Sequence, residues 1–277
     1  MIQDISPSRL SNSYKALTAG EEDSLLCFDS EGNILVDTSS GEIRFPKRKE
    51  VRAAETVYAF SVDDERYFIP LSEHSVSDER FSRMTLRQLR DGFGGKELFA
   101  AFTGYHLWKW YADNVFCGKC GKRLSLHEKE RALQCGKCGN IIYPRINPAV
   151  IVGVVNGDSL LITRYRRGYA YNALVAGFTE IGETLEQTVE REVMEETGVR
   201  VKDIRYYKSQ PWGLAQDMLV GFFCEAEGSG EIHMDENELK YAEWVKRGDI
   251  ITQPNKHSLT NEMMTVFKEG KDPFSAK

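Results

Sequence analysis

No long apolar run occurs in this chain of 277 residues. Because a membrane-spanning helix needs about 18 apolar residues or more, we expect no membrane partner. The N-terminal residues also lack the apolar core of a secretory signal peptide, so we expect a cytoplasmic protein. Positive charge is not in excess, since the formal net charge is −6. That balance argues against a broad, non-specific grip on nucleic acid.

Internal repeats and low-complexity segments are missing too, apart from one doubled cysteine motif. The hydrophobic fraction of 41% and the charged fraction of 28% are typical of a soluble globular protein. The length allows two domains, or one domain with an extension. Two short basic clusters occur. Residues 47–49 are expected to form a solvated loop, whereas residues 164–167 follow a predicted strand and could face a phosphate.

Cysteine is scarce, and four of the six cysteines form one pattern. Cys117 and Cys120 make one Cys-x2-Cys pair, and Cys135 and Cys138 make a second. The glycines beside them permit tight turns that aim paired thiolates at one ion, and four sulfur ligands suit tetrahedral Zn²⁺. Disulfides are the alternative, but they are rare in the cytosol. Four protein ligands leave no open position, so we expect one structural zinc per chain.

Turn signals divide the chain into three predicted parts. Residues 1–112 alternate short apolar runs with turns and then become helical from residue 85 to 111, which predicts a small β-rich N-terminal domain followed by helices. A zinc ribbon is expected at residues 113–145. Cys27 and Cys224 lie inside apolar runs, and we expect both to be buried.

Residues 146–277 alternate predicted strands and helices, and we expect the catalytic domain here. An Asn-Gly pair after the first strand predicts a hairpin. A final helix is expected at residues 258–268. The predicted strands lie at residues 149–155, 159–164, 174–176, 200–207, 218–226 and 242–245.

Residues 177–199 are the most informative segment, GFTEIGETLEQTVEREVMEETGV. Thr184 and Gln187 predict a capping box, so a helix should begin at about Leu185 and end at Gly198. Glutamates crowd this helix. Like charges four residues apart repel by some tenths of a kcal/mol, which makes the helix unfavourable by itself.

A divalent cation would reverse that repulsion. Glu192 and Glu196 share one face of the predicted helix, with Glu195 one step around. Mg²⁺ and Mn²⁺ prefer such hard oxygen ligands. The ordinary alternative is a solvated acidic face.

The spacing favours the metal site, because the segment resembles the Nudix box, Gly-x5-Glu-x7-Arg-Glu-U-x-Glu-Glu-x-Gly-U with U apolar. Every fixed position is matched, by Gly177, Glu183, Arg191, Glu192, Val193, Glu195, Glu196, Gly198 and Val199. The resemblance implies an α+β fold, with a Nudix α/β/α sandwich on a mixed sheet. It also implies hydrolysis of a nucleoside diphosphate derivative, with box glutamates that bind Mg²⁺ or Mn²⁺ and help to activate water.

The box residues receive separate predicted roles. Glu192 and Glu196 are the expected principal metal ligands, because their spacing lets both grip one ion. Glu195 is expected to be a third ligand or the proton acceptor. Arg191 is expected to orient Glu183 through a charge-assisted bond.

Two metal ligands are expected beside the box. Gly177 should allow either a close backbone approach or a special φ, with the carbonyl group of Ala176 exposed toward the metal. The family also implies a carboxylate outside the box, for which we choose Glu238 in the acidic segment at residues 235–239. An exposed loop charge is the alternative for this residue.

Two features are similar to the NADH pyrophosphatase (NudC-like) subfamily of the Nudix hydrolases. One is the zinc ribbon directly before the box domain, and the other is the Ser-Gln-Pro-Trp motif at residues 209–212. The resemblance extends from about residue 85 to the C-terminus. It implies hydrolysis of NADH or NAD⁺ to a nicotinamide mononucleotide and AMP, removal of NAD caps from RNA, and a homodimer.

The same resemblance implies a set of substrate contacts. Trp212 could stack on a base or could be an ordinary core residue, and Arg87 could be an ordinary surface residue. The predicted substrate residues are Arg87, Tyr143, Gln210, Pro211, Trp212, Gly213, Leu214, Ala215, Gln216, Asp217 and Thr260.

The chain departs from the subfamily after Trp212. There the subfamily motif continues Pro-Phe-Pro-x-Ser, whereas residues 213–217 are Gly-Leu-Ala-Gln-Asp. The change removes two stiffening prolines and one aromatic ring that could stack on a base. Leu214 can still cover a base by apolar contact, and Asp217 adds a negative charge. The departure bears on whether NADH is the preferred substrate. It does not bear on the prediction that the chain hydrolyses a dinucleotide.

Two alternatives stay open at this stage. The chain could be a Nudix hydrolase that acts on ADP-ribose, an ADP-sugar or a dinucleoside polyphosphate. It could also be a non-catalytic, nucleotide-sensing zinc-ribbon protein, since zinc ribbons often bind nucleic acid. The complete carboxylate set argues against a sensor, which has no need for mutually repelling glutamates.

Overall fold

The computed structural model describes residues 1–167 and 171–271. The chain divides into two compact units. The first, here called the box unit, consists of Met1, Asn147–Pro211 and Asp217–Lys277. The second, here called the N-terminal unit, consists of Ile2–Ile146 and Trp212–Gln216. The short segment Trp212–Gln216 therefore packs with a part of the chain that is distant in sequence.

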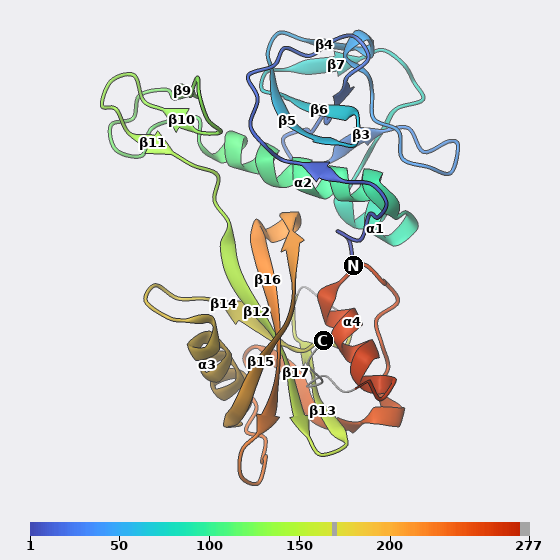
Figure 1. Ribbon diagram of the computed structural model, residues 1–277, viewed down its shortest axis with the longest axis vertical. Helices are drawn as coiled ribbons and strands as arrows, with labels where there is room; N and C mark the ends of the chain where they lie inside the picture. The colour runs from blue at the N-terminus through green and yellow to red at the C-terminus, as the bar shows by residue number, and fades with distance from the viewer. Residues whose placement is uncertain (168–170, 272–277) are drawn as a thin grey trace. The chain divides into compact units, whose positions relative to one another are not determined.

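A six-stranded mixed sheet forms the centre of the box unit (Figure 1). The strand order is β15-β16-β12-β13-β17, and β14 pairs with β12. Strand β12 is parallel to β16 and antiparallel to β13 and β14. The strands are β12 Asn147–Asn156, β13 Ser159–Tyr165, β14 Val175–Phe178, β15 Val201–Trp212, β16 Asp217–Ala226 and β17 Leu239–Lys246.

Two helices, α3 (Leu185–Thr197) and α4 (Leu259–Lys268), cover this sheet (Figure 1). Val189 of α3 belongs to the same core as Val150 of β12. Met263 of α4 belongs to a different core, together with the neighbouring Ile151. Because successive residues of a strand point to opposite faces, the helices lie on opposite faces of the sheet. The predicted α/β/α sandwich is confirmed.

Local signals set the ends of α3 as the sequence predicted. The Thr184 side chain accepts a hydrogen bond from the backbone N–H of Gln187, and the reciprocal bond is also present. At the other end Gly198 has a φ of +69°, a conformation that favours glycine. Several strands are longer than predicted; among them, β14 runs to Phe178 through pairing with Ala149, β15 runs to Trp212 instead of residue 207, and β17 spans Leu239–Lys246 instead of residues 242–245.

The N-terminal unit is β-rich, as predicted, with a four-stranded sheet in the order β1-β5-β6-β2 and the pairs β3–β8 and β4–β7. Helices α1 (Leu86–Gly92) and α2 (Gly95–Asp113) follow the strands. The strands are β1 Leu10–Ser11, β2 Ser24–Leu25, β3 Ile34–Val36, β4 Val51–Ala53, β5 Thr56–Val62, β6 Glu65–Pro70, β7 His74–Val76 and β8 Ser82–Met84. Short 3-10 helices are η1 Arg48–Glu50, η2 Gly213–Ala215 and η3 Arg247–Asp249.

The ribbon adds three short strands to the N-terminal unit, β9 (Ser125–Leu126), β10 (Leu133–Gln134) and β11 (Ile141–Ile142). Arg131 ties the ribbon to the preceding domain, because its guanidinium donates 2.7 Å to Asn12 Oδ1 and also to the carbonyl of Ala59. The ribbon and the N-terminal sheet are thus held together by direct bonds.

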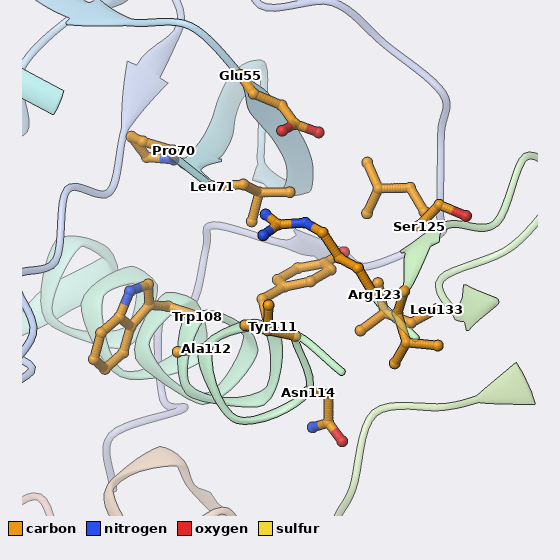
Figure 2. A pocket seen from close by; sticks show the side chains of 13 residues that line it. Glu55, Pro70, Leu71, Trp108, Tyr111, Ala112, Asn114, Arg123, Ser125 and Leu133 are labelled. Carbon is orange, nitrogen blue, oxygen red and sulfur yellow. The ribbon is translucent and has the colours of Figure 1, made fainter. Parts of the chain in front are cut away.

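A cavity of about 350 Å³ lies inside the N-terminal unit (Figure 2). Leu71 beyond β6, Tyr111 of α2 and Leu133 of the ribbon line it, with the charged side chains of Glu55 and Arg123 also at its wall. These walls come from the sheet edge, the helix end and the ribbon, so all three meet at one end of α2.

All six cysteines carry free thiols. Cys27 and Cys224 are fully buried, as predicted. Among residues 1–167 and 171–271, none of the helices is both long and apolar enough to cross a membrane.

Candidate active site

Strand β14 delivers Gly177 to the side of α3, where the Glu192 carboxyl group packs against bare backbone. A Cβ atom at residue 177 would lie 2.0 Å from Cδ of Glu192. No side chain fits at that distance, so the glycine permits the close approach of carboxylate and strand. The close backbone approach predicted for Gly177 is confirmed.

Arg191 is bonded to three carboxylates of the box. Its Nε and Nη2 donate to the two oxygens of Glu183 at 2.6 and 2.9 Å, in the predicted charge-assisted pair. Its Nη1 donates to Glu192 at 2.7 Å and to Glu195 at 3.0 Å. The bonds from Arg191 lower the pKa of Glu183 to about 2, so this carboxyl stays ionised. Arg191 therefore organises the box from its centre.

Glu196 is the most buried carboxylate of the box, with 3% of the residue exposed. Burial raises the pKa of Glu196 to about 8, and the charges of Glu192 and Glu238 raise it further, whereas a hydrogen bond from Tyr165 lowers it. Burial likewise raises the pKa of Glu192, again with a contribution from Glu238. The three carboxylates are thus close enough to repel one another.

Glu195 lies on the outer side of this group. Its side chain is 60% exposed, and its one hydrogen bond among the described residues comes from Arg191. An exposed carboxylate beside buried ones remains accessible to water, which suits a proton acceptor.

The donor set beside Gly177 fits a hard divalent cation. It consists of the carboxylates of Glu192, Glu196 and Glu238 and the carbonyl oxygen of Ala176. The N–H and the C=O of Ala176 both lie near the Tyr165 hydroxyl. All of these donors are oxygens, the type that Mg²⁺ and Mn²⁺ prefer. Buried carboxylates that repel one another are costly when ionised without a cation, so a divalent ion would stabilise their charged form.

The four ribbon cysteines form the predicted metal cluster. Their sulfur atoms all lie within 4.8 Å of one another. Sγ of Cys117 is 3.7 Å from that of Cys138, and Sγ of Cys120 is 3.5 Å from that of Cys135. Backbone N–H groups at Cys138 and Lys137 lower the pKa of Cys135 to about 6, which favours the thiolate. Four sulfurs with no open position make a structural zinc site.

Two predicted substrate residues of the box unit are buried. Gln210 is fully buried, and its amide donates to the carbonyl of His257 and accepts from the N–H of Leu259, both at 2.8 Å. Gln210 thereby holds the beginning of α4, next to the half-buried Thr260. Asp217 is 4% exposed, and within residues 1–167 and 171–271 its Oδ1 finds no hydrogen-bond partner. Burial raises the pKa of Asp217 to about 7.

The segment Trp212–Gln216 packs with α2. The Trp212 ring lies 5.3 Å from that of Phe102, between ring centroids, which places it in the core position considered as the alternative. Gly213 follows so closely that a Cβ atom would lie 2.1 Å from the Phe102 carbonyl oxygen. Leu214 also contacts this core, and Gln216 accepts a hydrogen bond from Arg145.

Two other predicted substrate residues also belong to the N-terminal unit. Tyr143 is exposed, and its hydroxyl donates 3.0 Å to Glu130. Arg87 is an exposed residue of α1. The structure therefore brings the carboxylates, Ala176, Gln210, Pro211, Asp217 and Thr260 into one compact unit and places the remaining predicted substrate residues in the other.

Sequence reasoning missed two residues beside the box. The Tyr165 hydroxyl lies 3.1 Å from Glu196 Oε1. Phe178, which directly follows Gly177, is 51% exposed although it is a large aromatic residue. The available signals were the end of a predicted strand for Tyr165 and an apolar residue inside a polar loop for Phe178.

The basic cluster at residues 164–167 is largely occupied by protein groups. Arg164 donates 3.0 Å to Asn172 Oδ1 and lies over the Tyr241 ring. Arg166 donates 3.1 Å to the carbonyl of Leu239. These bonds oppose the suggestion that the cluster faces a phosphate.

A mixed sheet between two helices, with the box on β14 and α3, defines a Nudix hydrolase. The NUDIX domain family matches residues 145–266, and the NADH pyrophosphatase zinc ribbon domain matches residues 112–143. The NAD-capped RNA hydrolase NudC of Klebsiella pneumoniae is 39% identical over 180 residues, which cover 64% of this chain and 68% of the relative. The chain belongs to the NudC family.

Further comparisons give similar proteins. The NAD-capped RNA hydrolase NudC of Haemophilus influenzae strain PittEE is 45% identical over 172 residues, which cover 61% of this chain and 64% of the relative. A crystal structure of a NUDIX hydrolase from Nitrosomonas europaea superposes with a TM-score of 0.49 at 22% identity, over 56% of this chain and 90% of that one.

Proposed function

We propose that this protein hydrolyses the pyrophosphate bond of NADH and NAD⁺, releasing a nicotinamide mononucleotide and AMP. One observation carries the proposal, namely that the close packing of Gly177 on Glu192 sets the glutamates of α3 beside Ala176, with one tyrosine hydroxyl within hydrogen-bond distance of both Glu196 and Ala176. Such a cluster suits a divalent cation that binds a diphosphate. The relatives named NAD-capped RNA hydrolase support the choice of an NAD-containing substrate.

The proposed roles follow from burial and hydrogen bonding. Glu192, Glu196, Glu238 and the Ala176 carbonyl would hold a divalent ion, and that ion would supply Lewis-acid chemistry by offsetting the charge of phosphate oxygens and making a nearby water more acidic. Glu195, the exposed carboxylate, accepts a proton from the attacking water. The water oxygen bonds to one phosphorus, and the bond from that phosphorus to the bridging oxygen breaks.

NAD-capped RNA is the second proposed substrate. The printed name of the relatives supports it, and the same pyrophosphate bond would be cut. ADP-ribose is the alternative substrate to test, because residues 213–217 lack the two prolines and the aromatic ring of the subfamily motif. ADP-ribose has no nicotinamide base, so it needs no base contact at the end of the molecule where NAD carries nicotinamide.

A substrate comparison tests the proposal. Full-length protein is incubated with NADH, NAD⁺, ADP-ribose or NAD-capped RNA, with Mg²⁺ or Mn²⁺, and the release of mononucleotide is measured. We expect kcat/KM for NADH or NAD⁺ to exceed that for ADP-ribose. Equal or faster turnover of ADP-ribose would identify ADP-ribose, instead of NAD(H), as the substrate. If no mononucleotide were released from any of the four compounds, the proposed activity would be rejected.

Substitution of the box carboxylates supplies the control for this comparison. We expect E195Q and E196Q each to lower kcat by about 100-fold or more, since each removes a charge at the reacting centre. E190Q is the matched control, because Glu190 is an exposed glutamate of the same helix. Retained turnover in E195Q or E196Q would reject these assignments.

Further expectations accompany the activity. We propose that either Mg²⁺ or Mn²⁺ supports turnover, that the chain forms a homodimer and that it works in the cytoplasm. Residues 1–112, 113–145 and 146–277 are the proposed domains. Light scattering coupled to size-exclusion chromatography would test the dimer.

A further inference from the structure

Tyr165 is the last residue of β13 and contacts the box from outside it. The pairing of β13 with β17 shifts register between Arg164 and Tyr165, whose partners are Tyr241 and Leu239. The extra, unpaired residue is Lys240 of β17, so β13 continues regularly to its end at Tyr165. The Tyr165 hydroxyl reaches both α3 and β14, where it contacts Glu196 and Ala176.

One hydroxyl group meets three groups of the proposed metal site. It lies 3.1 and 3.3 Å from the two carboxylate oxygens of Glu196. It lies 3.2 Å from the backbone nitrogen of Ala176 and 3.4 Å from the carbonyl oxygen of that residue. A phenol has one proton to donate. Donation to the carboxylate is the stronger bond when Glu196 is ionised, the form that a bound cation would favour.

This arrangement satisfies the hydrogen-bonding groups of the Tyr165 hydroxyl and leaves the oxygens that could bind a metal available. The proton goes to Glu196, and the hydroxyl oxygen accepts the N–H of Ala176. The Ala176 carbonyl oxygen then keeps its lone pairs for a cation. The bond to one carboxylate oxygen of Glu196 likewise leaves the other free.

Glu196 depends on this contact because Arg191 does not reach it. Arg191 bonds Glu183, Glu192 and Glu195, whereas the side-chain partner of Glu196 is Tyr165. The backbone of Ala176 also bonds Glu196, so removal of the Tyr165 hydroxyl would leave the buried carboxylate with fewer fixed partners and loosen its orientation toward a bound ion.

We infer that Tyr165 is a positioning residue that orients both Glu196 and the Ala176 carbonyl for divalent-cation binding. The inference rests on the proposed function only for the identity of the metal site. Partners that orient metal ligands typically change metal affinity by about 10- to 100-fold when removed. The hydroxyl of Tyr165 occupies that position for two ligands at once.

The test measures Mn²⁺ binding to zinc-replete, full-length protein without substrate, by electron paramagnetic resonance titration of free Mn²⁺. We expect Y165F to weaken Mn²⁺ binding about tenfold, with an unchanged thermal unfolding midpoint. Y207F is the matched control, because the Tyr207 hydroxyl also donates to a glutamate, 3.0 Å from Glu262, on the α4 side of the sheet. A Y165F affinity within twofold of the parent would overturn the inference.

A double substitution shows whether Tyr165 acts through Glu196. In an E196Q background we expect Y165F to cause a clearly smaller loss of Mn²⁺ affinity than in the parent, and an undiminished loss would contradict the inference. Because no substrate is present, failure to hydrolyse NADH would reject the proposed function and leave this result standing.

Discussion

The carboxylates of the box have two different kinds of partner. Arg191 bonds Glu183 in a bidentate pair, and Arg191 also holds Glu192 and Glu195. Glu196 has a neutral phenol as its partner instead. The bonds from Arg191 lower the pKa of Glu183 to about 2, whereas burial raises that of Glu196 to about 8 although the Tyr165 bond lowers it. Residues of one type therefore meet different environments, a structural ion pair in one case and the proposed metal site in the other.

Asp217 supplies a pH-dependent prediction at this scale. Its pKa rises from about 3.9 in an unfolded chain to about 7 on burial. Between these values the folded chain holds a proton that the unfolded chain has lost, so the free energy of unfolding falls as pH rises. We expect the free energy of unfolding of D217N not to fall in this way, because asparagine does not titrate. Its advantage over the parent should be smallest near pH 4, grow toward pH 7 by on the order of 3 kcal/mol, and stay constant above.

Urea unfolding at pH 4.5, 6 and 8 measures this difference. The same substitution at the exposed Asp249 serves as the control. If D217N and the parent differed by the same amount at all three values, Asp217 would not be buried as described.

At the scale of elements, the box depends on how β14 meets α3. Sequence predicted the helix accurately, because the capping residues and Gly198 are local signals. It placed the end of β14 two residues early, because that end depends on pairing with β12. A close backbone approach at Gly177 was predicted, but only the packed strand and helix fix its distance from the Glu192 carboxyl.

Gly177 provides the prediction at this scale. A Cβ at this position would overlap the Glu192 carboxyl, at 2.0 Å from its Cδ. We expect G177A to displace that carboxylate and to lower kcat about 100-fold, as misplacement by about 1 Å can do. Steady-state kinetics and the Mn²⁺ titration would both show the loss. G248A is the control, since no atom lies within 4 Å of its added Cβ; similar kinetics for G177A and G248A would refute the account.

The segment Trp212–Gln216 shows what a motif leaves open. The resemblance implies substrate contacts for these residues, which stay a prediction, while the structure shows that Trp212 packs on Phe102 and that Gly213 fits against the backbone of α2. A tryptophan in a motif does not say which surface its ring will cover. That choice depends on a helix more than a hundred residues earlier in the chain.

At the scale of the whole molecule, the chain combines two chemically different metal sites. The ribbon offers four sulfurs, and the box unit offers carboxylate and carbonyl oxygens. Soft sulfur and hard oxygen ligands select different ions. The two sites should therefore load independently, zinc for structure and Mg²⁺ or Mn²⁺ for hydrolysis.

Zinc content tests this division. We expect one zinc per purified chain, close to none in C135S, and earlier unfolding of C135S in denaturant, because zinc binding contributes directly to folding of such modules. C27A is the control, since Cys27 is buried away from the ribbon cluster and should leave the zinc content at one. Metal analysis by mass spectrometry would decide, and a full zinc complement in C135S would contradict a four-sulfur site.

Spacing alone determined the ligand chemistry of this protein: the cysteine pairs, the box glutamates and the ends of the box helix are all encoded within short segments. Tertiary structure decided which donors share a site. Tyr165 and Ala176 reach the box from strands β13 and β14, and Glu238 from the turn directly before β17, so their approach depends on the order of strands in the sheet. Burial by distant parts of the chain, which no local pattern encodes, then set the pKa values of Glu196 and Asp217.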